Sequence, residues 1–322
     1  MVKKRLAYEM EKGITVNFSV LPEGCISNII SLTSPRDACR LSAVSSVFRS
    51  AVDSDSVWER FLPSDYQEIL SRSVSPIAFS SKKDLYFYLT DHPIIIDGGN
   101  KSFALEKSSG SKCYMIAAKE LSIVWGDTPR YWRWISLPDS RFPVVAELLN
   151  VCWLEVHGKM DTRMLSPRTT YAAYIVLKFE EVRRGLDVNP AEVSVRFVGG
   201  GGGAVDEGIR NVYLDPEGNI SNQTWTARDR LQELFHNLRQ FMLTPSVVRP
   251  SVSLSRQNGL FPRERGDGWM EIEMGEFFND WGEDGEVEMS LMEIKGGNWK
   301  SGLIIQGIEL RPKQSSRMWQ SC

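Results

Sequence analysis

The sequence predicts an α+β protein, in which a small all-α unit precedes an all-β sandwich or jelly roll that carries a helical insertion. Short helical segments with capping residues fill the chain as far as residue 93, and short strand-like runs fill residues 94–312. At 322 residues the chain is long enough for two domains, on a prior of about 150 residues each. We therefore divide it into a helical unit (14–65), a helical linker (66–93), a β domain (94–312) and a tail (313–322).

The first predicted helix begins at the pair Leu21–Pro22. Proline suits the first helical position because its missing N–H would have no partner there. Apolar residues then recur at helical spacing, at Ile26, Ile29 and Ile30. This spacing predicts one apolar face on the helix.

A second helix is predicted after Ser34, which can cap it, with Pro35 at its first position and Asp37 placed as in a capping box. The apolar pattern continues at Leu41, Val44, Val47, Phe48, Val52, Val57, Trp58, Phe61 and Leu62. So short a unit cannot bury that many large apolar side chains by itself, which indicates a surface that a partner covers.

These residues closely resemble an F-box. The resemblance rests on the LP opening, the isoleucine pair, the S-P-x-D second helix and the run LSAVSSVFRSAVDSDSVWERFLPSDY with its tryptophan. It implies docking to a Skp-type adaptor and, through that adaptor, to a cullin ubiquitin ligase. The implied adaptor-binding residues are Leu21, Pro22, Ile26, Ile29, Leu32, Pro35, Val44 and Trp58. Val44 and Trp58 would support either the fold or the contact.

Two other interpretations of the helical unit remain open. Its apolar face could be wholly internal to a small helical domain. It could also be a DNA-binding helix-turn-helix, but its four arginines are outnumbered by six acidic residues. That is the wrong sign of charge for phosphate contacts.

Composition narrows the class of protein further. The net charge is only −3, so no strong field attracts nucleic acid or an anionic membrane. No window approaches the roughly 20 apolar residues of a membrane span, and no apolar run follows the basic N-terminus as in a secretory signal.

The five cysteines (Cys25, Cys39, Cys113, Cys152 and Cys322) show no C-x-x-C spacing. We therefore expect buried free thiols, no metal or cofactor, and a location in the cytoplasm or nucleus.

After two linker helices at 66–70 and 82–89, the pattern changes to short β runs separated by glycine and polar turns. Residues 170–179 alternate large apolar with smaller or polar side chains, as expected for a half-buried strand. The other runs are 94–97, 102–106, 112–117, 121–125, 151–156, 193–198, 269–274, 286–294 and 302–310. Strands without intervening helices favour an antiparallel sandwich or jelly roll.

An insertion interrupts the β pattern at about 199–263. Its run of five glycines, 199–203, is a flexible loop by composition, and neither a following lysine–threonine pair nor a G-x-G-x-x-G motif makes it a phosphate-binding loop. Residues 226–243 form a predicted amphipathic helix. Such a helix either covers a sheet edge or binds a partner.

An aromatic cluster and an acidic segment are the candidate binding residues of the β domain. Trp125, Tyr131, Trp132 and Trp134 lie within ten residues around a G-D-T-P turn. Indole rings stack on the C–H face of a pyranose, whose hydroxyls need acceptors and donors. Carboxylates, which accept such hydrogen bonds, are frequent between residues 271 and 288. The pattern predicts a shallow sugar-binding groove, although aromatic runs in β proteins often belong to the core instead.

Two long segments of the β domain resemble the phloem protein 2 family of plants, which includes the jasmonate-inducible tobacco lectin. They are AAKELSIVWGDTPRYWRWISLPDSRFPVVAELLNVCWLEVHGKMDTRMLSPRTTYAAYIVLKF and RGDGWMEIEMGEFFNDWGEDGEVEMSLMEIKGGNWKSGLIIQGIELRP. The resemblance implies a jelly-roll lectin fold that binds N-acetylglucosamine oligomers and N-glycan cores. It aligns the binding tryptophans with Trp125 and Trp132, and the binding glutamates with Glu276 and Glu283. Trp281 departs from the family, which has a smaller aliphatic residue there, and the inserted helix has no counterpart.

The acidic segment and the motifs of the sequence do not favour an enzyme. A glycosidase needs one carboxyl that stays protonated, and the acidic turn WGEDGE gives no reason for that. Neither H-E-x-x-H nor G-x-S-x-G occurs, and the acidic turn fails the calcium-loop pattern.

We therefore expect the non-catalytic substrate-recognition subunit of a Skp–cullin–F-box ubiquitin ligase, with a glycoprotein or protein target. The alternative is a carbohydrate-binding stress lectin without ligase function.

Overall fold

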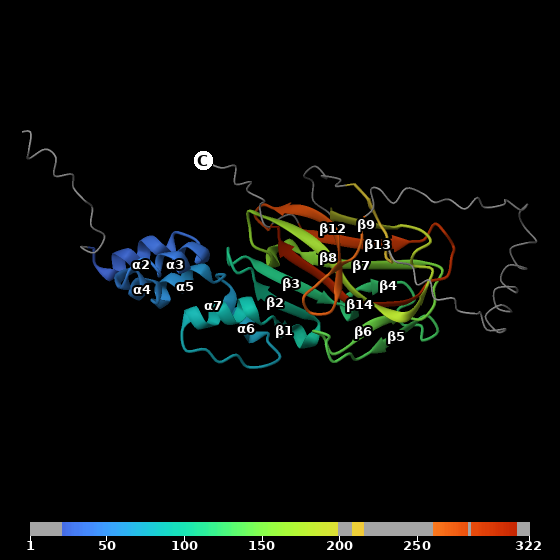
Figure 1. Ribbon diagram of the computed structural model, residues 1–322, viewed down its shortest axis with the longest axis horizontal. Helices are drawn as coiled ribbons and strands as arrows, with labels where there is room; N and C mark the ends of the chain where they lie inside the picture. The colour runs from blue at the N-terminus through green and yellow to red at the C-terminus, as the bar shows by residue number, and fades with distance from the viewer. Residues whose placement is uncertain (1–20, 199–207, 216–259, 283–284, 314–322) are drawn as a thin grey trace, which may run out of the picture.

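The computed structural model describes residues 21–198, 208–215, 260–282 and 285–313 (Figure 1). It consists of a helical unit at one end, two linker helices and a β-sandwich, which confirms the predicted α+β class. The predicted insertion helix at 226–243, the five-glycine run, Glu283 and the tail beyond residue 313 lie outside the described residues.

Short helices build the first described part of the chain. They are α2 (Glu23–Ser31), α3 (Pro35–Leu41), α4 (Ser46–Val52), α5 (Asp55–Phe61), α6 (Tyr66–Ser71) and α7 (Lys82–Asp91). Among them, α3, α4 and α7 have a serine side chain as N-cap. Pro22 is the cap residue of α2 rather than its first helical residue. Ser34 caps α3 as predicted, because its Oγ accepts the N–H of Asp37 at 3.1 Å. The hydroxyl of Ser34 in turn donates to the Asp37 carboxylate at 2.8 Å, so this aspartate binds the capping side chain itself.

The larger sheet contains nine of the described strands. Seven of them follow the order β1–β2–β3–β14–β8–β12–β11. The other two form a branch, in which β6 pairs with β14 and β5 pairs with β6. Its strands are β1 (Ile94–Ile96), β2 (Lys101–Leu105), β3 (Lys112–Ala117), β5 (Trp132–Ile135), β6 (Val145–Leu148), β8 (Thr169–Arg184), β11 (Arg263–Glu264), β12 (Met270–Asn279) and β14 (Ser301–Pro312). All its pairings are antiparallel.

The smaller sheet packs against the larger one and has the order β10–β9–β13–β7–β4 among the described strands. Its members are β4 (Ser122–Ile123), β7 (Leu154–Asp161), β9 (Ala191–Val198), β10 (Arg210–Val212) and β13 (Glu286–Glu293). Inward residues of β7 such as Leu154 and Val156 are buried, and the residues between them are partly exposed. The alternation is that of an antiparallel sheet with one covered face.

One hydrophobic core joins the helical unit to the sandwich, running from Ile26 to Leu310. Tyr86 of α7 lies at the junction, with its ring 5.2 Å from that of Trp58 between centroids. Its hydroxyl reaches the carbonyl oxygens of Glu106 and Lys107 at 3.3 and 3.2 Å. The linker helices are therefore part of the packing between the two domains.

Polar contacts reinforce this junction. Arg72 after α6 makes a bidentate pair with Asp97, with both N···O distances 2.8 Å. Lys112 of β3 pairs with Asp65 at 2.7 Å. The bidentate geometry fixes the angle at which α6 meets the sandwich.

Four described strands were not predicted: β5, β6, β10 and β11. The aromatic run of β5 was interpreted as a turn, and the fully buried β6 is too short to show a period. β10 lies within the expected insertion, yet it pairs with β9 and extends the smaller sheet. The expectation of buried thiols is also wrong for Cys25 and Cys39, which are exposed on the helical unit.

Candidate functional site

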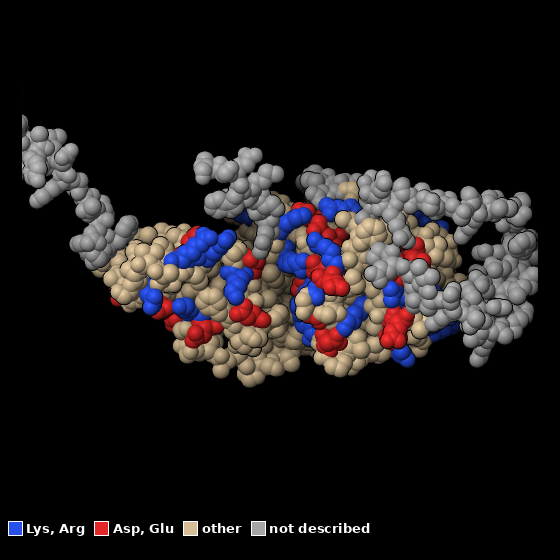
Figure 2. Space-filling model, in the orientation of Figure 1, with Lys and Arg blue, Asp and Glu red and all other residues tan. Residues whose placement is uncertain are grey.

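The first candidate site is an exposed aliphatic face on the helical unit, which we call the helical apolar face. Leu32, at the end of α2, is 71% exposed, and Val44, between α3 and α4, is 66% exposed. The remaining exposed aliphatic residues of this face are Leu21, Ile29 and Val47. Figure 2 shows a largely uncharged surface over α2 at this end of the molecule. Exposed aliphatic groups gathered on one small unit indicate a docking surface.

Three of the predicted adaptor contacts lie inside the helical unit instead. Ile26 and Trp58 are at most 1% exposed, and Pro35 is buried. The indole N–H of Trp58 donates to the carbonyl of Val52 at 2.6 Å. In this structure these three side chains support the shape of the face, whereas Leu21, Pro22, Ile29, Leu32 and Val44 are exposed on it.

The second candidate site is an aromatic patch at the end of β4, centred on Trp125. The backbone of Trp125 has φ = 59°, in the left-handed region, so the chain turns sharply there and presents the ring, which is 43% exposed. The Tyr131 ring lies 5.3 Å away between centroids. The indole N–H of Trp134 donates to the carbonyl of Gly126 at 3.1 Å and fixes the turn. The patch offers an exposed ring face to a ligand.

Trp132 does not belong to this exposed patch, because its side chain is only 2% exposed. It lies opposite Leu148 in the pairing of β5 with β6, and the alternation of the strand directs it into the core. In this conformation its ring has no face available for a sugar.

Glu276 lies at the other end of the sandwich from Trp132. On β12 it is opposite Ala172 of β8, and its carboxylate pairs with Lys313. Trp132 of β5 lies opposite Leu148 of β6. The pairing of β6 with β14 continues this row to Leu303 of β14, which lies opposite Phe179 of β8. Phe179 lies seven positions after Ala172, which corresponds to roughly 23 Å of strand. The structure therefore does not bring the predicted tryptophans and Glu276 into one groove.

Trp281 stands at the Glu276 end and is 65% exposed. The guanidinium of Arg168 lies over its ring at 5.2 Å from the centroid. Glu283 lies outside the described residues.

Sequence reasoning missed three residues beside the aromatic patch: Trp153, Glu155 and His157. Trp153 is 41% exposed, and the N–H of Val124, next to Trp125, donates to the carbonyl of Glu155 at 3.1 Å. The spacing W-x-E-x-H was the available signal, because alternate residues of a strand share one face.

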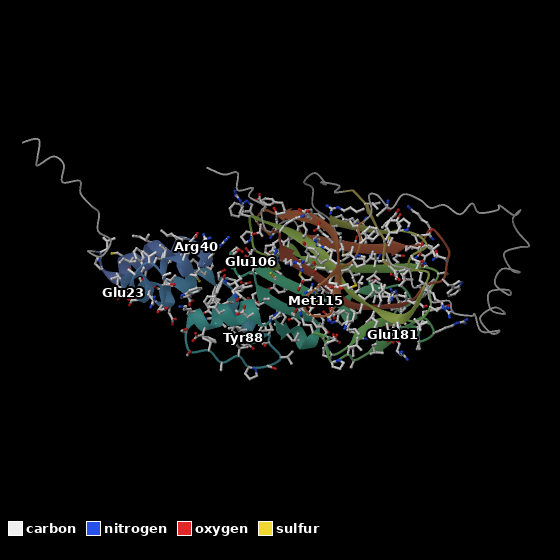
Figure 3. All side chains as sticks on the ribbon, viewed as in Figure 1. Glu23, Arg40, Tyr88, Glu106, Met115 and Glu181 are labelled. Atoms are coloured by element: carbon white, nitrogen blue, oxygen red, sulfur yellow. The ribbon has the colours of Figure 1, made fainter. Side chains whose placement is uncertain are left out.

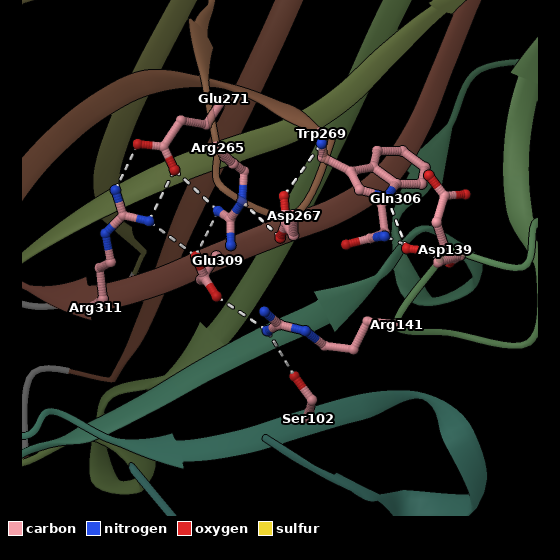
Figure 4. Close-up of polar contacts among 11 residues, drawn as sticks. Ser102, Asp139, Arg141, Arg265, Asp267, Trp269, Glu271, Gln306, Glu309 and Arg311 are labelled. Atoms are coloured by element: carbon pink, nitrogen blue, oxygen red, sulfur yellow. Dashed lines mark hydrogen bonds and ion pairs between the residues drawn. The ribbon is translucent and has the colours of Figure 1, made fainter. Parts of the chain in front are cut away.

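A cluster of arginines and glutamates covers the outer face of the larger sheet (Figure 4). Arg311 pairs with Glu271 at 2.6 Å and with Glu309 at 2.9 Å, and Arg265 reaches the same two carboxylates at 2.9 and 2.8 Å. Arg141 adds a contact to Glu309 at 3.0 Å. The opposite charges satisfy one another, so we assign this cluster to stability rather than to ligand binding.

Neither a metal site nor a membrane span is found in the part of the chain that the structure describes. No group of three or more histidine, cysteine, aspartate or glutamate residues there could hold an ion. No helix among the described residues combines the length and the apolar character needed to cross a bilayer.

Comparison with known proteins accounts for both parts of the chain. Residues 18–64 match the F-box-like family model, and residues 111–312 match that of phloem protein 2. The chain is 48% identical over 302 residues to the F-box protein At2g02240 of Arabidopsis thaliana, covering 94% of this chain and 82% of that protein. It is 44% identical over 308 residues to the F-box protein PP2-B1 of the same plant, covering 93% of this chain and 91% of that protein. With both family models matched and relatives aligned along almost its whole length, this chain belongs to the family of F-box proteins that carry a lectin-like phloem protein 2 domain.

Proposed function

We propose that the protein is the substrate receptor of a Skp–cullin–F-box ubiquitin ligase. The helical apolar face carries this proposal, because its aliphatic side chains are exposed on an F-box and match what an adaptor would bury. The receptor itself does no bond chemistry. It raises the concentration of its target beside the ubiquitin-transfer machinery, which is catalysis by proximity. The cytoplasm or nucleus, where such ligases and their targets meet, is the proposed location.

A pull-down of a Skp-type adaptor tests the proposal. Leu32→Glu and Val44→Glu each place a charge on the helical apolar face, and we expect each to weaken binding at least about tenfold, as at central interface positions. Val182→Glu is the matched control, because Val182 is 51% exposed on β8, in the sandwich. Equal recovery of the adaptor by all three variants, each shown to be folded by circular dichroism, would reject this face as the docking surface.

For the sandwich we propose recognition of the target through its glycans, at the aromatic patch. The exposed rings of Trp125 and Tyr131 support this proposal, because adjacent aromatic faces suit the apolar face of a pyranose. Three of the four residues predicted from the family lie in the part of the chain that the structure describes. Because Trp132 is buried and Glu276 is distant, we centre the proposed site on Trp125 among these three.

Binding of chitin oligomers and N-glycan cores to the full-length protein tests the glycan proposal. Trp125→Ala is expected to lower affinity about fivefold, since stacking on an aromatic ring contributes on the order of 1 kcal/mol. Trp281→Ala is the control, because Trp281 is exposed at the opposite end of the sandwich. If no glycan binds the wild-type protein, recognition of a protein surface replaces the glycan proposal and the ligase proposal is unaffected. If glycans bind but the wild-type protein captures no adaptor, a lectin acting without a ligase becomes the better account.

A further inference from the structure

The second half of β7 has a partner strand on one side only, among the strands that the structure describes. β13 pairs with β7 along its whole length. On the opposite side β4 has two residues, and its pairing ends where Ser122 lies opposite His157. Just before Ser122 the chain turns away from β7 in a 3₁₀ turn over Ala118–Glu120. The second half of β7 is therefore an open edge of the smaller sheet.

The main-chain groups on this open edge are those of Lys159 and Asp161. The N–H of Val124 donates to the carbonyl of Glu155 at 3.1 Å, so the main chain of Glu155 faces β4. Alternate residues of a strand direct their N–H and C=O groups to the same edge, which places those of Lys159 and Asp161 on the β4 side as well. Past the end of β4, no residue that the structure describes forms a main-chain hydrogen bond with them there. An extended chain can pair with these groups as an added strand.

A cleft of about 510 Å³ lies along the open edge. His157 and Lys159 of β7 line it together with Ser122, where β4 ends. Ile116 of β3 is the apolar residue that lines it from the larger sheet. The volume falls within the range of about 300–1,000 Å³ typical of ligand sites, and residues 158–161 correspond to roughly 13 Å of strand. The space beside the edge is therefore large enough for a short extended segment.

Glu120 is a charged residue of the cleft without a partner. It is exposed, and its carboxylate makes no hydrogen bond or ion pair with any residue in the described ranges. The two lysines of the cleft, in contrast, each lie near a carboxylate. Lys101 Nζ is 3.3 Å from Asp97 Oδ2, and Lys159 Nζ is 3.9 Å from Glu288 Oε1. The charge that the cleft leaves to an incoming group is thus negative, which favours a cation beside Glu120.

We propose that the open edge of β7 binds an extended peptide by strand addition, with a lysine or arginine of the peptide paired to Glu120. The peptide takes the place that β4 would occupy if it continued past Ser122, and its main chain pairs with Lys159 and Asp161. Side chains of a strand alternate between the two faces, so an apolar residue of the peptide packs toward Ile116. The site is independent of glycan recognition at the aromatic patch. That the peptide belongs to a target of the ligase rests on the proposed receptor function.

Selection of a random hexapeptide library displayed on phage, with the full-length protein as bait, tests the charge preference. We expect the wild type to enrich peptides that carry lysine or arginine among apolar and β-branched residues. Glu120→Lys should enrich aspartate or glutamate at the same position. Glu264→Lys is the matched control, because Glu264 is exposed on β11 outside the residues that line the cleft, and it should select as the wild type does. Absence of a basic consensus, or the same consensus from Glu120→Lys, would overturn the proposal.

The most enriched sequence, made as a synthetic peptide, tests the main-chain pairing by calorimetry. Lys159→Pro removes the N–H on the open edge, where proline is tolerated better than inside a sheet. We expect it to bind the peptide about tenfold more weakly, because a strand hydrogen bond is lost and the ring obstructs the edge. Lys159→Ala keeps the N–H and should bind as the wild type does. Equal affinity of the two variants, each shown to be folded by circular dichroism, would refute strand addition.

Peptides methylated at alternate amide nitrogens repeat this test without altering the protein. Methylation of the amides that face β7 should abolish binding, and methylation of the other set should not. Equal loss from both sets would contradict strand addition.

Two further measurements identify the occupant of the edge. Trp125→Ala should leave peptide affinity unchanged, and a loss there would move the peptide to the aromatic patch and overturn its assignment to β7. Sedimentation of the wild type should show no dimer that Lys159→Pro removes, because such a dimer would make a second copy of the chain the occupant instead. Failure of the peptide proposal in any of these tests leaves the adaptor and glycan proposals intact.

Discussion

The carboxylate of Glu309 shows how strongly neighbouring charges can change the pKa of a single side chain. Burial alone would raise its pKa, but attraction to Arg141, Arg265 and Arg311 outweighs burial and brings the pKa to about 2. An unfolded glutamate titrates near 4.3. The folded state therefore binds this proton less readily than the unfolded state, so its contribution to stability is complete above about pH 5 and is lost as the pH falls toward 2.

Replacing Glu309 with glutamine should remove that contribution. We expect the free energy of unfolding at pH 7 to fall on the order of 3 kcal/mol, the value that a depression of two to three pKa units implies. The loss of stability between pH 5 and pH 3 should also be smaller in the variant than in the wild type. Urea unfolding at pH 7, 5 and 3 measures both effects, with Glu264→Gln, an exposed change on neighbouring β11, as the control. Parallel curves of stability against pH for Glu309→Gln and the wild type would contradict this assignment.

At the scale of an element, α3 is the helix that depends most visibly on its cap. It has seven residues, too few for an isolated helix to be stable, and Ser34 binds its first turn through both hydroxyl contacts with Asp37. Ser34→Ala should cost about 1 kcal/mol and accelerate amide hydrogen exchange in α3. Because Val44 follows this helix on the helical apolar face, adaptor affinity should also fall modestly. Ser34→Thr, which keeps the hydroxyl, should behave as the wild type; unchanged exchange in Ser34→Ala would show that packing alone holds α3.

The helices could be predicted because their signals are local: Ser34, Pro35 and the isoleucines of α2 each act within one or two turns. The strand at 170–179 was found from its local alternation, although β8 continues to Arg184 and its residues 171–177 are buried on both faces. For β7 only the first part was found, because the predicted run 151–156 overlaps Leu154–Asp161 by three residues. β10 could not be found, because its place beside β9 depends on a pairing that no local pattern encodes.

The candidate site was harder to predict than the fold. The distance between Trp132 and Glu276 is set by how β8 pairs with β12 on one side and β14 on the other, and by how β6 joins β5 to β14. Sequence proximity and family alignment carry no information about that register. Trp132 was misjudged for a related reason, because only the pairing of β5 with β6 decides which of its faces is covered.

At the scale of the whole molecule, the docking surface and the aromatic patch are separated by a continuous core. Figure 3 places Glu23 of α2 and Glu181 of β8 at opposite ends of the long axis. Trp132 lies at the level of Phe179, two residues from Glu181 along β8, so the aromatic end is remote from the F-box. The shared core and the Arg72–Asp97 pair hold the F-box against the sandwich. We therefore expect the two to behave as one rigid arm, which would present a target bound at the far end at a fixed distance from the adaptor.

Tyr86 and Tyr88 of α7 test this rigidity as a matched pair. Tyr86 is fully buried at the junction, whereas Tyr88 is 40% exposed. Tyr86→Ala should cost roughly 3–5 kcal/mol and lower the melting temperature by about 5–10 °C, while Tyr88→Ala should cost under about 1 kcal/mol.

Far-ultraviolet circular dichroism follows the helices and near-ultraviolet circular dichroism follows the tryptophans, which lie mostly in the sandwich. Because one core connects the two domains, both signals should melt together in the wild type and shift together in Tyr86→Ala. A helical transition that precedes the tryptophan transition in the wild type would mean that the F-box unfolds independently, and a flexible tether would then replace the rigid arm.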